Sequence, residues 1–171
     1  MSDDNTTDTP PEASTEASAP QQPISINAQY IKDLSFEAPE TPGIFSIMQS
    51  NAPDVTINID VNAHPVQDST FEVQLHTKAE CKVGDKTAFI CELVYGGLFT
   101  LNVEEEHVQP MLLIECPRLL FPFARNVMAD ATRDGGFPPL MLAPVDFVSM
   151  YQQQAAAAAA AKAEGEKDTV N

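Results

Sequence analysis

The sequence predicts an α+β fold, in which a four-stranded antiparallel sheet is followed by two main helices. Four segments between residues 30 and 100 alternate with a period of two, which is the side-chain period of a β-strand. After residue 104 the apolar residues recur at helical spacing instead. The strands therefore come first in the chain, and the helices follow them.

The first two predicted strands each have one apolar face. In residues 30–37, Leu34 and Phe36 point one way, while Asp33 and Glu37 point the other way and give a mostly acidic face. Prolines between residues 38 and 43 end this strand, because proline cannot donate a hydrogen bond to a sheet. The second strand, residues 55–61, alternates apolar with polar residues; its apolar members are Val55, Ile57, Ile59 and Val61.

The third and fourth predicted strands form a hairpin. Residues 71–82 alternate regularly, and the turn at 83–86 leads into residues 87–100. The fourth strand is apolar on both faces: Cys91, Leu93 and Tyr95 belong to one row, and Ile90 belongs to the other. A strand that is apolar on both sides needs cover on both sides, which two helices do not easily supply. The sequence therefore predicts self-association through the row of Cys91.

The helical part is interrupted twice. Acidic residues at 104–106 suit a first helical turn, Pro117 is expected to interrupt the helix, and the glycines at 135–136 stop it. The loop at 137–144 has no polar side chain, so we expect a neighbouring subunit to cover it or an apolar partner to bind it. Asp146 is expected to cap a last helix from residue 147 to about 161.

Composition separates a folded part, residues 25–154, from two tails. Residues 1–24 are acidic and rich in proline, so a disordered tail is expected, and residues 155–171 predict an alanine-rich, fraying helix and a disordered end. The net charge of −16 has the wrong sign for binding nucleic acid or an anionic membrane. No apolar run approaches about 18 residues, and the start lacks a secretory signal pattern, so neither membrane insertion nor secretion is expected.

The residues give little support for catalysis or for a cofactor. The three cysteines, an odd number within apolar patterns, fit a reducing cytoplasm. The histidines are scattered and no cysteine pair has metal-ligand spacing, so no metal is expected. Two alternatives remain beside a protein that binds other proteins: a small thiol-dependent enzyme centred on Cys116, and a purely structural oligomer.

Four segments resemble the SecB-type protein-export chaperones of Gram-negative bacteria. They are KDLSFEAP at 32–39, TAFICE at 87–92 with GGLF at 96–99, CP at 116–117 with LFPFAR at 120–125, and GFP at 136–138 with LAPVDF at 142–147. They fall in order over roughly residues 28–151. The resemblance implies a non-enzymatic cytoplasmic homotetramer, built as a dimer of dimers, that holds precursor proteins unfolded and delivers them to the SecA motor ATPase.

The resemblance also suggests which residues do this work. Val55, Ile57 and Ile59 match positions that line the client groove of the family, and we add Phe137, Leu140 and Leu142 from the apolar loop. The residues matching the SecA contact are Asp33, Glu37, Ile90 and Glu92. Cys91, Leu93 and Tyr95 match positions that influence the oligomeric state. The long acidic N-terminus and the alanine-rich C-terminus depart from the family pattern.

Overall fold

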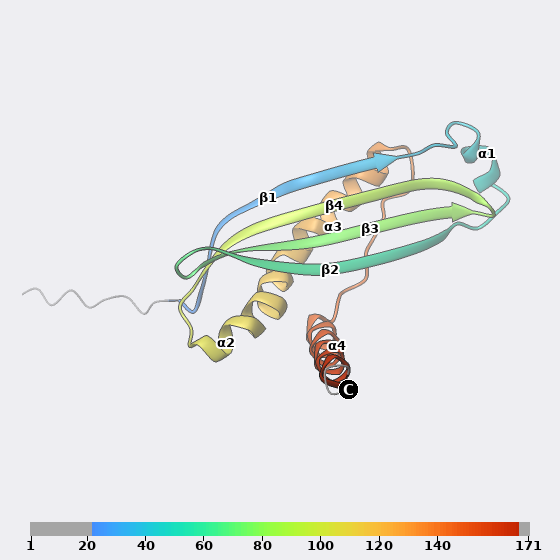
Figure 1. The fold of residues 1–171 in the computed structure, drawn as a ribbon. Coiled ribbons are helices and arrows are strands. Elements are labelled where there is room, and N and C mark those ends of the chain that lie inside the picture. The colour runs from blue at the N-terminus through green and yellow to red at the C-terminus, as the bar shows by residue number, and fades with distance from the viewer. Residues whose placement is uncertain (1–21, 168–171) are drawn as a thin grey trace, which may run out of the picture.

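The computed structural model describes residues 22–167 and contains the predicted sheet with its helices (Figure 1). Residues 1–21, most of the predicted N-terminal tail, and residues 168–171, the end of the predicted C-terminal tail, lie outside the described residues. The elements in chain order are β1 (Ile24–Glu37), α1 (Ile44–Met48), β2 (Asp54–Gln67), β3 (Thr70–Val83), β4 (Lys86–Leu101), α2 (Glu105–Pro110), a π-helical turn η1 (Met111–Glu115), α3 (Cys116–Asp134) and α4 (Phe147–Lys167).

All strand pairs in the sheet are antiparallel, and the strand order is β1-β4-β3-β2. The prediction of a four-stranded antiparallel sheet is confirmed. β1 begins six residues earlier than the alternating pattern indicated, because its backbone continues to pair with β4 as far as Ile24–Leu101. β2 likewise extends to Gln67 through Pro65, which an edge strand tolerates because one side of its backbone is unpaired.

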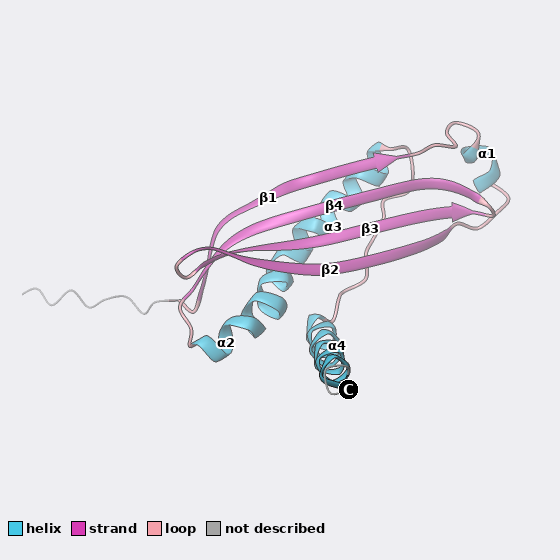
Figure 2. Cartoon of the chain, viewed as in Figure 1, coloured by secondary structure: helices cyan, strands magenta, loops and turns pink. Residues whose placement is uncertain are grey.

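One face of the sheet, here called the helix face, is covered by α3, which crosses behind the strands (Figure 2). Leu120, Ala124 and Met128 are buried on the inner side of α3, and Cys91 of β4 lies with its Sγ 3.5 Å from the Met128 Sδ. No helix covers the opposite face within the described residues, and we call it the open face. The core of the chain therefore lies between the sheet and α3.

The expected helix break at Pro117 takes a different form. The chain stays helical from α2 into α3, and the irregularity is the π-helical turn directly before Pro117. The Cys116 N–H donates to the Met111 carbonyl, five residues back. Pro117 therefore lies inside a continuous helical run, and the π-helical turn before it is where the regular hydrogen-bond pattern changes.

The prediction that the apolar loop is exposed is wrong for most of its large side chains. Phe137 and Leu142 are buried, and Leu140 is half-buried against the core. The ring of Phe137 lies 5.0 Å from that of Phe89 and 5.2 Å from that of Phe45 in α1. The loop is therefore covered by its own chain, because it folds back over the helix face and joins the core.

Two local devices fix the start and end of this loop. Gly136 adopts φ +88°, a conformation that side chains disfavour, and so turns the chain out of α3. Asp146 caps α4, as predicted, by accepting a hydrogen bond from the Ser149 N–H at 3.0 Å. Helix α4 continues past the expected end near residue 161 to Lys167, and α1 was not predicted.

Candidate functional site

The open face of the sheet brings together the four residues predicted to contact SecA. In the register of β1 and β4, Glu37 pairs with Ile90 and Ser35 with Glu92, while Asp33 pairs with Val94. Directly paired residues of an antiparallel sheet point to the same side. Asp33, Glu37, Ile90 and Glu92 therefore share the open face, at the β1 side of the sheet.

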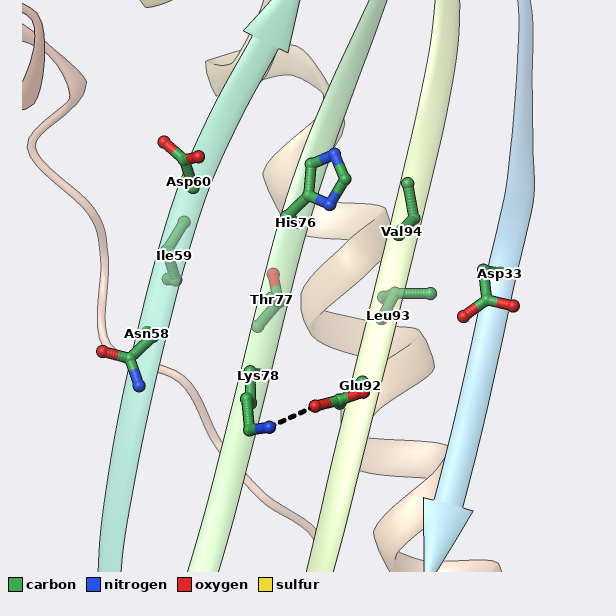
Figure 3. A pocket seen from close by; sticks show the side chains of 10 residues that line it. All are labelled: Asp33, Asn58, Ile59, Asp60, His76, Thr77, Lys78, Glu92, Leu93 and Val94. Carbon is green, nitrogen blue, oxygen red and sulfur yellow. Dashed lines mark hydrogen bonds and ion pairs between the residues drawn. The ribbon is translucent and has the colours of Figure 1, made fainter.

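A shallow depression of about 280 Å³ lies across the strands on this face (Figure 3). It includes Asp33 and Glu92 of the predicted set, whereas Glu37 and Ile90 lie further along the same strands. The other lining residues are Asn58, Ile59, Asp60, His76, Thr77, Lys78, Leu93 and Val94. Sequence reasoning did not select Asp60, His76 or Lys78, although the alternating pattern of the third predicted strand already put His76 and Lys78 in one row.

Carboxylates outnumber cations in this depression. Asp33, Asp60 and Glu92 come from three different strands, and Lys78 forms an ion pair with Glu92. The hydrogen bond that Lys78 donates to the Glu92 carboxylate raises the pKa of Lys78, with smaller Coulombic contributions from Glu80 and Glu37. The open face can therefore attract cationic groups, and one of its acids already has a cationic partner in the chain.

A second cluster on the open face fastens β1 to β3. Glu72 accepts hydrogen bonds from the Tyr30 hydroxyl, from Lys32 Nζ at 2.8 Å and from Gln74 Nε2 at 2.8 Å. The bond from Lys32 is the largest cause that lowers the pKa of Glu72 to about 2, and the bond from Tyr30 comes next. Gly96 makes the bridge possible, because a Cβ there would lie 2.6 Å from the Tyr30 ring.

The residues predicted to bind clients separate into two environments. Val55 and Ile57 lie on the helix face of the edge strand β2, 37% and 39% exposed, and Ile59 beside them is half-buried. Ile57 and Ile59 line a hollow of about 370 Å³ with Asp60 and with Met150, Gln153 and Gln154 of α4. Phe137 and Leu142 do not line this hollow, and their predicted role as accessible groove residues is corrected, because both belong to the core.

The predicted oligomer residues Cys91, Leu93 and Tyr95 are buried inside one chain, under α3. This corrects the expectation that their side chains are free to face another subunit. The exposed apolar side chains of β1 and α3 are Ile31, Leu34, Leu119 and Phe123. Tyr95 is linked to this group, since its ring stacks on that of Phe123 with the centroids 6.4 Å apart.

The structure argues against a thiol nucleophile. Cys116 has no exposed surface, and burial raises its pKa to about 12, with a smaller contribution from Glu115. It is therefore a neutral thiol at physiological pH, whereas a nucleophile must be a thiolate. Cys81 and Cys91 are buried as well, and none of the three cysteines is in a disulfide.

Glu104, Glu106 and His107 offer ligand atoms within 4.8 Å of one another, but all three side chains are exposed and such acidic groups are common without an ion. None of the helices in residues 22–167 is long and apolar enough to cross a membrane.

The exposed candidate residues form two surfaces on opposite faces of one sheet. The surface on the open face is charged, and the surface on the helix face is apolar. The architecture is that of an α+β protein whose sheet has one face covered by a helix and one open face.

Comparison with known proteins gives the family. Residues 17–158 match the family model described as "Preprotein translocase subunit SecB". The chain is 53% identical over 145 residues to the protein-export protein SecB of Paramagnetospirillum magneticum, covering 83% of this chain and 94% of the relative. It is 54% identical over 136 residues to that of Rhodospirillum rubrum, covering 80% and 84%. The chain belongs to the SecB family of protein-export chaperones.

A solved structure shares the fold. It is a SecB-like chaperone of Mycobacterium tuberculosis in complex with a ChAD peptide from the HigA1 antitoxin. The TM-score is 0.56 at 19% sequence identity, and the match covers 72% of this chain and 91% of the other. At this identity the likeness concerns the fold.

Proposed function

We propose that this protein is a cytoplasmic export chaperone that holds precursor proteins unfolded and delivers them to the SecA motor ATPase. The observation that supports this best is the exposed apolar side of β2, where Val55 and Ile57 remain accessible beside the hollow under α4. Exposed apolar groups of this kind are typical of a surface that binds another chain. The peptide bound to the SecB-like chaperone of M. tuberculosis is consistent with the same use of the fold.

The apolar surface suits a client that has no fixed sequence. Val55, Ile57 and Ile59 of β2 are aliphatic, and the hollow beside them adds the flexible Met150 of α4 together with the polar Asp60, Gln153 and Gln154. Methionine adapts to different partners because its side chain is unbranched and polarizable. We propose that Val55, Ile57 and Ile59 contact the client, that the half-buried Leu140 extends this contact, and that Phe137 and Leu142 hold the loop from below.

We propose that SecA docks on the open face through Asp33, Glu37, Ile90 and Glu92. The face offers an excess of carboxylates around one exposed aliphatic anchor, which complements a basic partner segment. It lies on the side of the sheet opposite to Val55 and Ile57. In this proposal a client and SecA can be bound together, so that delivery does not require the client to be released before SecA docks.

We propose a homotetramer, built as a dimer of dimers, that assembles through the exposed apolar side chains of β1 and α3. Leu34 and Phe123 are 42% and 51% exposed, and a second copy of the chain would remove them from water. In this proposal Cys91, Leu93 and Tyr95 act indirectly. They set the position of α3 on the sheet, and Tyr95 supports the ring of Phe123.

The deciding experiment asks whether the purified protein prevents aggregation of a slow-folding secretory precursor in the absence of ATP. We expect suppression at a stoichiometric ratio of tetramer to precursor, measured by light scattering. A tetramer that leaves aggregation unchanged would support the purely structural oligomer instead. Cys116→Ala should suppress aggregation as well as the wild type does, whereas a thiol-dependent activity would be lost.

A further inference from the structure

Lys78 occupies the middle of the proposed docking face. It lies on β3, directly opposite Glu92 in the register of β3 and β4, and its ammonium group contacts the Glu92 carboxylate. Both side chains are about half exposed, at 50% and 45%. Figure 3 shows this pair between Asn58 on β2 and Asp33 on β1.

Two other lysines, Lys32 and Lys82, form ion pairs with glutamates that do not line the depression. Lys32 is held by Glu72, and Lys82 lies 3.1 Å from Glu80. Among the described residues that line the depression, Lys78 is the one lysine or arginine. It therefore carries the positive charge that any cation approaching Glu92 meets first.

We propose that Lys78 is an intrachain competitor for Glu92, so that a basic partner must displace its ammonium group in order to dock. This inference rests on the docking site proposed above and adds a residue that sets the affinity and the specificity of that site. A segment with one positive charge gains little, because it only exchanges one cation for another. A segment with several cations can displace Lys78 and still engage Asp33 and Asp60, so Lys78 selects for densely basic partners.

The arrangement is reversible because the pair is exposed. An exposed ion pair contributes little to stability, since water screens it and two long side chains lose freedom in forming it. Lys78 can therefore swing away without disturbing the sheet. The neighbouring acids Glu92, Glu80 and Glu37 favour the charged form of Lys78 and raise its pKa.

Removal of the competitor should strengthen docking. In calorimetry at low salt we expect Lys78→Gln to bind SecA about two- to fivefold more tightly than the wild type, the range that exposed ion pairs allow. A loss of structure at this site would weaken binding instead, so the direction of the change separates competition from damage. The affinity of the variant should also fall more steeply with salt, because more uncompensated acid faces the partner.

Lys86→Gln is the matched control. Lys86 also forms an ion pair with an exposed glutamate, Glu40 at 3.2 Å, and the two pairs are similarly exposed. It lies at the start of β4, outside the depression. Lys86→Gln removes the same charge from the molecule, so it reports any effect of net charge alone. We expect its affinity for SecA to stay close to that of the wild type.

A second measurement does not depend on SecA. Nuclear magnetic resonance of the lysine side chains should show the pKa of Lys78 falling toward its ordinary value in Glu92→Gln and staying raised in Lys86→Gln. An unchanged Lys78 pKa in Glu92→Gln would overturn the proposal, because the pair would not exist in solution. Equal or weaker SecA binding by Lys78→Gln, in a protein whose Glu37→Lys/Glu92→Lys variant does lose SecA, would overturn it too. If that double variant binds SecA normally, the docking site itself is wrong.

Discussion

Single buried polar groups fix parts of this fold that apolar packing alone does not. The hydroxyl of Thr132 lies 3.0 Å from the Met128 carbonyl, to which it donates, and accepts a hydrogen bond from the Leu140 N–H at 2.9 Å. Thr132 is fully buried, so this one side chain satisfies a backbone donor of the apolar loop where water cannot. The loop is held to α3 by this bond.

Thr132→Val keeps the shape of the side chain but leaves the Leu140 N–H without a partner. We expect it to lower the free energy of unfolding by about 1–3 kcal/mol, the cost of an unsatisfied buried donor. Urea unfolding at a fixed protein concentration measures the change. Thr132→Ser retains the hydroxyl and is the matched control; if it destabilises the protein as much as Thr132→Val, the hydrogen bond is not the cause.

Glu72 makes stability depend on pH at the acid end. Its folded pKa of about 2 lies below the ordinary value of 4.5. A depressed carboxyl pKa stabilises the fold above 4.5, and this contribution is lost as the pH falls from about 4.5 to 2. We expect Glu72→Gln to be less stable than the wild type at neutral pH and to lose less stability through that window, measured by unfolding at several pH values.

Tyr30 gives the opposite sign at the alkaline end. Burial, with help from Glu72, raises its pKa from 10.0 to about 12, so its contribution is present below pH 10 and is lost as the pH rises toward 12. Asp85→Asn, an exposed change in the β3–β4 turn, is the control for both windows. If Asp85→Asn and Glu72→Gln give the same acid profile, the cluster does not couple to folding.

At the scale of elements, periodicity predicted β3 and β4 closely, gave β1 and β2 too short, and predicted the loop badly. The period of two in a strand does not depend on which strand it pairs with, so it can be seen in the sequence alone. The predicted strands at residues 71–82 and 87–100 therefore end within a residue or two of the ends of β3 and β4. The loop has no period, and its composition does not say which surface it covers. The same limit applies to Lys78, because its pairing with Glu92 depends on the register between two strands.

The exposed apolar side chains of α3 are where a substitution should change assembly. We expect Phe123→Glu to shift the tetramer toward smaller species in light scattering at micromolar concentration, since each buried aromatic side chain contributes on the order of 1.5–3 kcal/mol and symmetry repeats the loss. Leu93→Glu should instead unfold the chain, because Leu93 lies in the core. Val66→Glu is the control at an exposed apolar position of β2; equal dissociation by this control would remove α3 from the interface.

The edge strand β2 is where a substitution should change client binding. Val55→Ser/Ile57→Ser removes exposed apolar surface without opening the core, so we expect weaker capture of an unfolded precursor by an intact tetramer. Competition with a fluorescent unfolded precursor measures the affinity, and Val66→Ser is the control on the same strand. Unchanged capture by the double variant would place the client surface elsewhere.

At the scale of the molecule, the family was recognisable from sequence because its motifs are spread over β1, β4, α3 and the loop that follows α3. The glycines of two motifs have a structural reason: Gly96 allows the close approach of Tyr30, and Gly136 turns the chain out of α3. Sequence reasoning also put Asp33 and Glu37 on one face. It did not show that this face is opposite to Val55 and Ile57, because that relation follows from the strand order β1-β4-β3-β2 and from the register of each strand pair.

The opposition of the two surfaces leads to the last prediction. If SecA docks on the open face, Glu37→Lys/Glu92→Lys should weaken SecA binding measured by calorimetry at low salt and should spare the holding of clients on the other face. The wild-type complex should also weaken as ionic strength rises from about 50 to 200 mM, because exposed charges are screened over a shorter distance. Saturation with a precursor should leave the SecA affinity largely unchanged.

Two results would contradict this arrangement. SecA binding that is insensitive to the double variant would place docking outside the open face. A precursor that abolishes SecA binding would show that the two partners share one surface, and delivery would then require release before docking.

Asp85→Lys is the control for these charge reversals. It also replaces an acid by a lysine, at the β3–β4 turn outside the depression, and so separates a local contact from the effect of making the net charge less negative than −16. We expect Asp85→Lys to retain most of the wild-type affinity, because docking depends on which carboxylates face the partner rather than on their total number.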